Sequence, residues 1–455
     1  MGKTIKFGGT SLGTAELDKE AAKYVITKKT DSVTILVVSG QGKSEKRPRM
    51  YKLTDYAYGI INKTIPDARD IFFSIIEDNI RDHGFNISLL DKLLDESKHI
   101  IQSGDYTGEN AAKIIGLPER VKARIMQKLL IDAGHETILL DYDRNCIFGR
   151  FSEINIDVDV SHKTTRTEIQ LAARHFGLEG KIVIIPGFIG TKEGTNEMVT
   201  LERGMSDGTA TYWGSALLSE EIEIHSDQDG ICRVDPRLVS EAETIERLTY
   251  REAEAFSGLG AGIISYVSIK PAKERGIPIR ILNTFNKKNT GTLIDHDGGL
   301  NEERFPVRAI AYVPGYVIAK VSEMPMNKPG VAAYVLGVFA KYGISIDGMK
   351  DGDSCMTYAF KTNRNLFQLL QELDEAEHPV DLRTRMTRIS LMGEMMIHSR
   401  DNGKKVDIIA SDVLYSRGIP VELRVSERSS VIKTFYVPEA YAESAVINLN
   451  NALRS

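Results

Sequence analysis

Short apolar runs alternate with amphipathic helical stretches along the first two thirds of the chain, from Thr4 to about Ile294. Runs such as 33–38 and 182–185 have the length and the β-branched composition of buried strands. Stretches between them, such as 119–133, place their apolar residues on one helical face. Buried strands that alternate with helices are typical of parallel sheets. The pattern therefore predicts an α/β fold with a mainly parallel sheet and helices on both of its faces.

A chain of 455 residues is too long for one hydrophobic core, so we expect more than one domain. The segment 288–306 is rich in Gly, Asn and Asp and poor in apolar residues, which makes it the best candidate linker. We therefore expect a first domain over residues 1–295 and a second region over residues 306–455.

Beyond this linker the chain repeats itself at an offset of 75 residues, so that 330–347 corresponds to 405–422. In the first copy the apolar residues form one helical stripe, Gly343 provides a helix stop, and a strand follows. Gly418 is the equivalent of Gly343 in the second copy. Each copy predicts a strand, a helix and a strand. Duplication of such a small unit after a catalytic-sized domain indicates a binding module.

Charge and composition exclude several classes of protein. Lys plus Arg (58) nearly balance Asp plus Glu (63), so the net charge of −5 gives no general attraction to nucleic acid or to an anionic membrane. No apolar run approaches the roughly 20 residues that cross a bilayer. Cys146, Cys232 and Cys355 are too far apart in sequence for a zinc or redox pair, and the histidines lack metal-ligand spacing. We expect a cytoplasmic protein with reduced thiols, no nucleic-acid or membrane partner, and no side-chain metal site.

Gly42-Lys43-Ser44 follows a strand and matches the end of a P-loop. A P-loop also needs a glycine five positions before Gly42, where this chain has Val37, and a helix after it, where Pro48 interrupts. A P-loop NTPase is therefore a minor alternative, and a basic surface loop is the simplest one.

The first strand ends in Lys6-Phe7-Gly8-Gly9-Thr10-Ser11. Gly8 and Gly9 remove side chains where backbone N–H groups would approach an anion. The hydroxyls and a helix that starts near Thr14 add further donors. The segment predicts a phosphate site, although adjacent glycines alone would also fit a simple tight turn.

The same hexapeptide resembles the opening signature of the aspartokinases, within the amino acid kinase family. Further blocks resemble that family in order and spacing, namely 37–43, 53–55, 186–190, 200–207 and 226–237. The duplicated tail is similar to the paired ACT modules that sense amino acids, and residues 390–394 match a strand of the second module. The resemblance covers essentially the whole chain.

The resemblance implies an amino acid kinase fold followed by two ACT-type modules of ferredoxin-like βαββαβ order. The first module would span about 315–385, and the second about 386–455, completed by a strand from about 306–314. The implied reaction is ATP-dependent phosphorylation of the β-carboxylate of L-aspartate to 4-phospho-L-aspartate, the first step towards lysine, threonine and methionine. Lysine or threonine would be the feedback effector, and the ACT modules would form a homodimer or a higher homo-oligomer.

The resemblance also assigns site residues. An aspartate side chain with a pKa of about 3.9 is already ionised at pH 7, so catalysis must depend on positioning and charge neutralisation. Lys6 and Asp207 would be catalytic, and Gly8, Gly9 and Ser39 would contact phosphate. L-Aspartate would contact Thr54, Glu119, Phe188, Arg203 and Ser206, with Arg203 on the α-carboxylate and Glu119 on the α-ammonium. ATP would contact Ser226, Asp227, Asp235 and Arg237, with Mg²⁺ held mainly by its phosphates and water. The effector would contact Met326, Gly330, Val331 and Asp347.

Some residues depart from the family pattern. Glu202 and Met205 replace glycines beside the substrate block, Cys232 stands where an aromatic residue is usual, and 260–262 lacks the second lysine of some members. Two alternatives therefore stay open, a relative that acts on a different carboxylate and a catalytically weak amino acid sensor.

Individual residues also have simpler interpretations. Glu119 could be an ordinary acid in the first turn of a helix. Asp207 could be a helix N-cap, and Asp347 could cap a turn before Gly348.

Overall fold

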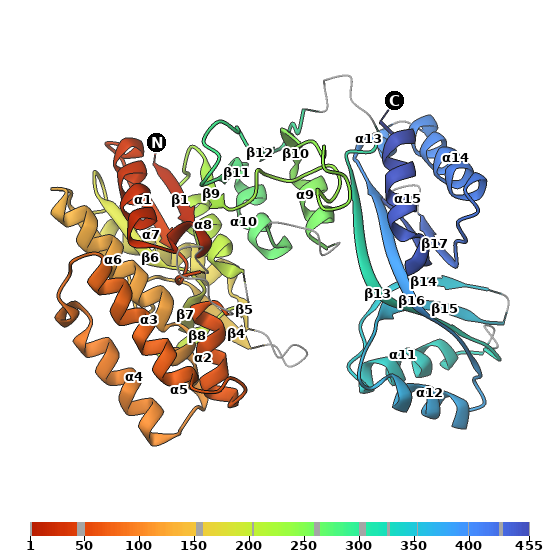
Figure 1. Cartoon of the computed structure of the whole chain (residues 1–455), viewed down its shortest axis with the longest axis horizontal. Helices are drawn as coiled ribbons and strands as arrows, with labels where there is room; N and C mark the ends of the chain where they lie inside the picture. The colour runs from red at the N-terminus through yellow and green to blue at the C-terminus, as the bar shows by residue number, and fades with distance from the viewer. Residues whose placement is uncertain are drawn as a thin grey trace. The chain divides into compact units, whose positions relative to one another are not determined.

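The computed structural model describes residues 2–42, 51–151, 158–202, 204–258, 264–299, 306–324, 328–352, 354–398, 400–426 and 431–454. They form two compact units (Figure 1). The first unit consists of Met1–Ile231, Glu246–Tyr250 and Ile263–Gly298. The second consists of Cys232–Ile245, Arg251–Gly262 and Gly299–Ser455.

An eight-stranded sheet forms the centre of the first unit, in the order β10-β12-β11-β9-β1-β2-β6-β3. Neighbouring strands are parallel except for β11 and β12. The central strands β2 and β6 are buried at every position, as the continuous apolar runs predict. The strands are β1 (Lys3–Phe7), β2 (Thr34–Val38), β3 (Thr137–Leu139), β6 (Ile182–Pro186), β9 (Ile222–Ser226), β10 (Arg247–Thr249), β11 (Ile279–Asn283) and β12 (Thr292–Asp295).

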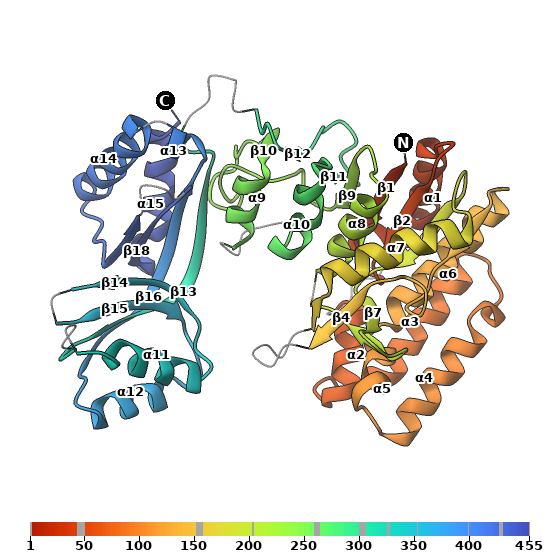
Figure 2. The same ribbon diagram turned by 180° about the vertical axis from the view of Figure 1, so that it is seen from behind.

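Helices cover both faces of this sheet (Figures 1 and 2). On one face α1 (Ala15–Lys28) and α6 (Leu117–Asp132) share a core with the alternate residues Ile5 and Phe7 of β1. On the other face α8 (Met205–Ala216) contacts β1 and β2, and α7 (His162–Phe176) and α10 (Tyr266–Arg275) pack against α8. The predicted fold class is therefore confirmed for this unit, and the alternation along β1 directs Lys6 towards α8.

Two smaller parts complete the first unit. A helical layer buries its own apolar core against the start of α6 and consists of α2 (Leu53–Asn62), α3 (Ala68–Asp82), α4 (Asp91–Ser103) and α5 (Gly108–Ile115). A four-stranded sheet has the order β5-β4-β7-β8 and consists of β4 (Phe148–Phe151), β5 (Val158–Val160), β7 (Ile189–Lys192) and β8 (Met198–Thr200). Short helices are η1 (Thr10–Leu12) and η2 (Ile87–Leu89).

An antiparallel six-stranded sheet, in the order β14-β15-β13-β16-β18-β17, forms the centre of the second unit. Its strands are β13 (Ala309–Val321), β14 (Ile346–Asp351), β15 (Met356–Lys361), β16 (Val380–Met392), β17 (Leu423–Ser426) and β18 (Ile432–Pro438). Its helices are α9 (Tyr250–Phe256), which begins at the last residue of a first-unit segment, α11 (Val331–Lys341), α12 (Leu366–Glu375), α13 (Met395–His398), α14 (Arg400–Ser416) and α15 (Glu439–Ala452).

Two modules of βαββαβ order share the long strands β13 and β16. An irregularity in the pairing between Val313 and Tyr316 divides β13 into two parts. The later part of β13 leads into α11, β14, β15, α12 and the start of β16, whereas the end of β16 leads into α14, β17, β18 and α15. The earlier part of β13 pairs with the end of β16. The first copy of the sequence repeat thus spans α11 and the start of β14, whereas the second spans most of α14 and ends one residue before β17. The ACT-type fold is confirmed.

The exact domain boundaries stay a prediction. Part of the expected linker 288–306 is strand β12 of the main sheet, while 300–305 lies outside the described residues. The segment Cys232–Ile245 belongs to the second unit, because the amide of Ile310 donates to the Arg233 carbonyl and the Arg233 guanidinium donates to the carbonyls of Val307 and Leu453. In the parts of the chain that are described, no helix is long and apolar enough to cross a membrane.

Candidate active site

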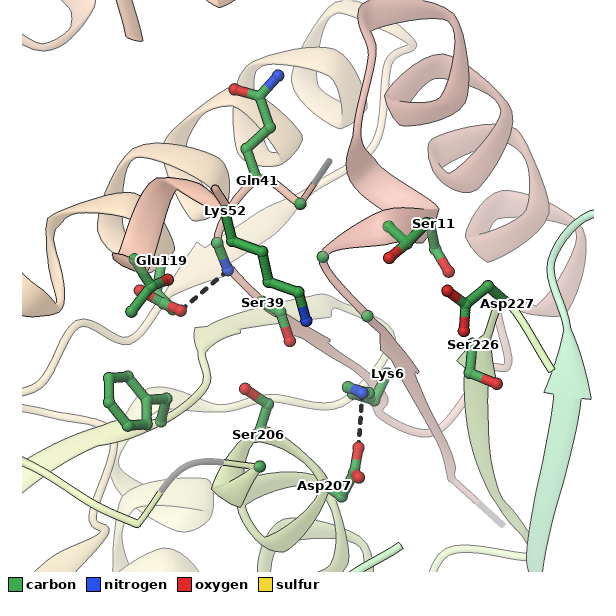
Figure 3. A pocket seen from close by; sticks show the side chains of 18 of the residues that line it. Lys6, Ser11, Ser39, Gln41, Lys52, Glu119, Ser206, Asp207, Ser226 and Asp227 are labelled. Atoms are coloured by element: carbon green, nitrogen blue, oxygen red, sulfur yellow. Dashed lines mark hydrogen bonds and ion pairs between the residues drawn. The ribbon is translucent and has the colours of Figure 1, made fainter. Parts of the chain in front are cut away.

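Strands β1, β2, β6 and β9 end at one cavity, where a parallel sheet commonly binds its ligand (Figure 3). Lys6 lies near the end of β1, Ser39 directly follows β2, Phe188 follows β6, and Ser226 ends β9. The cavity has a volume of about 310 Å³. It is lined by Lys6, Gly8, Gly9, Thr10, Ser11, Ser39, Gly40, Gln41, Gly42, Lys52, Thr54, Asp55, Glu119, Phe188, Gly204, Ser206, Asp207, Ser226 and Asp227.

The loops after β1 and β2 pack backbone against backbone at the cavity wall. The Gly42 amide donates to the Gly9 carbonyl over 2.8 Å, and a Cβ atom on Gly9 would lie 2.5 Å from the Gly40 carbonyl oxygen. Gly9 has an ordinary φ of −60°, so the loop needs its small size and not its conformational freedom. The Gly8 amide already donates to the His225 carbonyl, whereas the first amides of η1 have no acceptor within that helix. The open donors therefore lie at Thr10 and Ser11.

Lys6 and Asp207 form an ion pair at the cavity floor. The Lys6 Nζ atom lies 2.6 Å from Asp207 Oδ1, and both side chains are about one tenth exposed. Asp207 lies in the first turn of α8, whose N-cap is Gly204, so it is not the N-cap itself. Ser206 precedes it and packs so closely on Gly187 that a Cβ atom there would lie 2.7 Å from the Ser206 hydroxyl. The start of α8 thus holds the Asp207 carboxylate against the ammonium group of Lys6.

Glu119 presents a buried carboxylate to the same cavity. It lies in the first turn of α6, and its Oε1 atom accepts a hydrogen bond from the Gly40 amide over 3.1 Å. Its Oε2 atom has no hydrogen-bond partner among the described residues. Burial raises the pKa of Glu119 to about 8, and the backbone hydrogen bonds from Gly40 and from Glu119 itself only partly offset this rise. Glu119 is therefore more than an ordinary first-turn acid, because a bound cation would satisfy an otherwise unpaired oxygen.

Two further groups of residues lie at the sides of the cavity. Thr54 and Asp55 lie in the first turn of α2, and the Asp55 carboxylate accepts from the Lys52 amide over 3.0 Å. Lys52 extends its own side chain into the cavity (Figure 3). Ser226 and Asp227 lie at another side, close to Ser11 in the same view.

Some predicted site residues are not gathered there. Arg203 and Met326 lie outside the described residues. Asp235 and Arg237 belong to the second unit and do not line the cavity. They pair with each other over 2.6 Å, and the neighbouring guanidinium lowers the pKa of the Asp235 carboxyl. A local ion pair within an Asp-Pro-Arg turn accounts for their arrangement in this structure.

The predicted effector residues lie in the first of the two C-terminal modules. Gly330 is the N-cap of α11 with a φ of 95°, which favours glycine, and Val331 begins the helix. Asp347 lies within β14 and does not cap a turn. The Tyr316 hydroxyl donates to Asp347 Oδ2 over 2.6 Å, and Arg388 Nη1 lies 3.8 Å from the same oxygen. Burial and this bond raise the pKa of Tyr316.

Sequence reasoning missed several residues of the cavity wall. Most of them lie in the blocks 37–43, 53–55 and 200–207, which the sequence had already singled out. Lys52 lies between the blocks 37–43 and 53–55 and belongs to neither, so no motif in the sequence points to it. The missed residues are Gly40, Gln41, Gly42, Lys52, Asp55 and Gly204, whereas Thr10 and Ser11 were expected as donors of the phosphate site.

The described part of the chain contains no group of three His, Cys, Asp or Glu side chains that could hold a metal ion. Asp207 and Asp227 are single carboxylates in the cavity wall, and each could add one ligand to an ion carried by a nucleotide. The donor set thus fits Mg²⁺ that arrives with phosphates better than a dedicated side-chain site.

Comparison with known proteins adds independent information. The model of the amino acid kinase family matches residues 3–283. The chain is 26% identical over 461 residues to aspartokinase 1, chloroplastic, of Arabidopsis thaliana, across 98% of this chain and 79% of that protein. Two structures of E. coli aspartokinase III match 100% of both chains at 21% identity. The complex with aspartate and ADP has a TM-score of 0.80, and the complex with lysine and aspartate has one of 0.76. At this identity the structural likeness supports the fold alone.

Proposed function

Because the chain belongs to the amino acid kinase family, we propose that it is an aspartate kinase, which transfers the terminal phosphoryl group of ATP to the β-carboxylate of L-aspartate. The observation that carries this proposal is the pairing of two features in one cavity. The Lys6 ammonium lies among phosphate-binding loops, and Glu119 offers a buried, unpaired carboxylate oxygen. An amino acid acceptor needs both, because its ammonium requires an anion and its phosphorylation requires a cation.

At the phosphoryl end, Lys6 neutralises the charge of the group in transfer, and Asp207 holds its ammonium in place. The Ser39 hydroxyl and the first amides of η1 donate to phosphate oxygens from the ends of β2 and β1. The carboxylate of aspartate attacks phosphorus as the bond to ADP breaks, and no general base is needed because this carboxylate is already ionised.

At the acceptor end, Glu119 binds the α-ammonium group of aspartate. Thr54, Phe188 and Ser206 line the same cavity as Glu119 and Lys6, and their positions in its wall support contacts to the amino acid. Arg203 follows Glu202 on the approach to α8 and is assigned to the α-carboxylate, for which its guanidinium offers two parallel donors.

At the nucleotide end, Ser226 and Asp227 bind ATP, and one structural relative was solved in complex with aspartate and ADP. Asp235 and Arg237 stay assigned to ATP by resemblance to the family. Mg²⁺ bound to the phosphates supplies charge neutralisation, and Asp207 and Asp227 are the side chains in the cavity that would contact its coordination sphere.

The second unit is proposed to be regulatory. Its two ACT-type modules bind lysine or threonine, and one structural relative was solved with lysine. The contacts are assigned to Met326, Gly330, Val331 and Asp347, and the modules pair with those of a second copy of the chain. Inhibition then requires tighter binding of the effector to a less active state.

A substrate panel tests the proposed activity. ATP, Mg²⁺ and hydroxylamine are incubated with L-aspartate, L-glutamate or N-acetyl-L-glutamate, and the hydroxamate formed from any acyl phosphate is measured with and without lysine and threonine. Product from aspartate alone supports the proposal. Product from another carboxylate would mean that the chain is a family member with a different substrate. No product at all would favour an amino acid sensor.

A further inference from the structure

Lys52 is a second lysine in the cavity that contains Lys6. It directly precedes α2, where its amide donates to Asp55 and its carbonyl accepts from the amides of Asp55 and Tyr56. These bonds fix the Lys52 backbone beside Thr54 at the cavity wall. Its side chain is exposed to solvent, as expected for a residue at a cavity entrance. Figure 3 shows the Lys52 amine extended into the cavity, towards Ser39 and Lys6.

The two amines differ in their partners. Lys6 is paired with Asp207 at 2.6 Å, so much of its charge is already balanced. Lys52 forms no ion pair with an acidic side chain of the described residues. Two ammonium groups directed into one small space repel each other unless an anion lies between them. An anion with more than one negative charge, such as a terminal phosphoryl group, satisfies both.

We propose that Lys52 is a catalytic residue that binds the terminal phosphoryl group of ATP together with Lys6. This inference rests on the proposed function. During transfer a carboxylate oxygen forms a bond to phosphorus while the bond from phosphorus to the bridging oxygen of ADP breaks. Lys52 donates hydrogen bonds throughout and gains or loses no proton. Its positive charge reduces the repulsion between the attacking carboxylate and the phosphoryl oxygens. Lys6 alone reduces this repulsion less, because Asp207 already balances much of the Lys6 charge.

Calorimetry with two nucleotides tests this contact without relying on catalysis. Mg²⁺ with adenylyl imidodiphosphate presents a terminal phosphoryl group, and Mg²⁺ with ADP does not. In Lys52→Met we expect the Kd for the imidodiphosphate to rise at least about fivefold and the Kd for ADP to stay within about twofold of the wild type. Lys52→Arg should restore most of the difference, because it keeps a cation at the same place.

Lys63→Met is the matched control, since Lys63 is an exposed lysine at the other end of α2 and outside the cavity. It should bind both nucleotides as the wild type does. In the aspartate assay Lys52→Met should lower kcat at least about tenfold, within the range for the loss of one charge-stabilising donor.

Three results would overturn the assignment. They are unchanged affinity for the imidodiphosphate, an equal loss of affinity for both nucleotides, or a rise in the KM for aspartate at unchanged kcat and nucleotide affinity. If the wild type forms no phosphoaspartate, the proposed function fails, but the comparison of the two nucleotides still decides whether Lys52 contacts a terminal phosphoryl group.

Discussion

Lys122 Nζ lies 2.5 Å from Asp18 Oδ2, and neither side chain is more than 1% exposed. His83 Nε2 lies 3.1 Å from the same carboxylate oxygen, and the Asn79 side chain accepts from Lys122. Asp18 lies on α1, which follows the Gly8-Gly9 loop, and Lys122 lies on α6, one turn beyond Glu119. The buried pair therefore joins the helix that follows this loop to the helix that carries Glu119.

Lys122→Met should destabilise the protein by about 3–5 kcal/mol, because it leaves the buried Asp18 carboxylate without its ammonium partner. Urea unfolding followed by circular dichroism measures the change. Asp18→Leu combined with Lys122→Met should recover most of the loss, since it removes both charges. Lys128→Met, at an exposed ion pair of the same helix, is the control and should cost less than about 1 kcal/mol. A single variant as stable as the wild type would contradict the buried pairing.

The affinity for aspartate should depend on the ionisation of Glu119. Its pKa of about 8 means that the free protein carries mostly the protonated acid at neutral pH, while an ammonium group binds the carboxylate form. We expect kcat/KM for aspartate to rise with pH up to about 8, roughly tenfold per unit well below that value, and then to level off. Glu119→Gln should lower kcat/KM and remove this limb. The same limb in Glu119→Gln would assign the titration to another group.

The free energy of unfolding should also depend on the ionisation of Glu119, but it should fall with rising pH where kcat/KM rises. The pKa of Glu119 is raised in the folded protein, so between the ordinary value of 4.5 and about 8 the folded state binds more protons than the unfolded state. The contribution to stability is fully present below 4.5 and is lost as pH rises through 8. Glu119→Gln should therefore gain stability relative to the wild type between pH 5 and pH 8.5 in urea unfolding without substrate. A difference that stays constant over this range would contradict the raised pKa.

Lys6→Ala should lower kcat by at least about 10²-fold, the scale for one preorganised charge-stabilising group. The fold should survive, because the substitution removes a side chain at a strand end beside a cavity. Steady-state kinetics and circular dichroism measure the two effects. Lys19→Ala, on the exposed side of α1, is the control and should keep wild-type kcat. Near-normal turnover in folded Lys6→Ala would remove Lys6 from the catalytic assignment.

Asp347→Asn should weaken feedback inhibition, because it removes the charge that Tyr316 and Arg388 hold in place on β14. A coupling of about 1–3 kcal/mol corresponds to a 5- to 150-fold change in effector affinity, and we expect a loss within that range. Titration of activity with lysine and with threonine measures it. Asp351→Asn, an exposed acid on the same strand, should leave inhibition unchanged. Equal inhibition of the Asp347 variant and the wild type would exclude Asp347 from the effector site.

Much of the fold could be predicted from the sequence because it depends on local patterns. The runs that became β2 and β6 are apolar at every position except Thr34, so they predict central parallel strands. The family resemblance assigned Lys6, Ser39, Phe188 and Ser226 to one site, and they do line one cavity, because neighbouring parallel strands end at the same edge of a sheet.

Other features depend on contacts that a sequence does not display. The short strand β12 stands among glycines and asparagines and owes its place to backbone pairing with β10 and β11. The segment that contains Arg233 joins the second unit through hydrogen bonds to main-chain carbonyls of distant residues. Glu119 differs from an ordinary first-turn acid only because the tertiary structure buries it and leaves one oxygen unpaired.

In the proposed reaction this cavity binds ATP and L-aspartate and the side-chain carboxylate of aspartate is phosphorylated. The most direct test traps the product of ATP, Mg²⁺ and L-aspartate with hydroxylamine and separates β-aspartyl hydroxamate from its α isomer by chromatography. We predict the β isomer alone from the wild type and at least about 10²-fold slower formation of it by Lys6→Ala. Formation of the α isomer, or of no hydroxamate by a folded protein that binds ATP, would contradict the account.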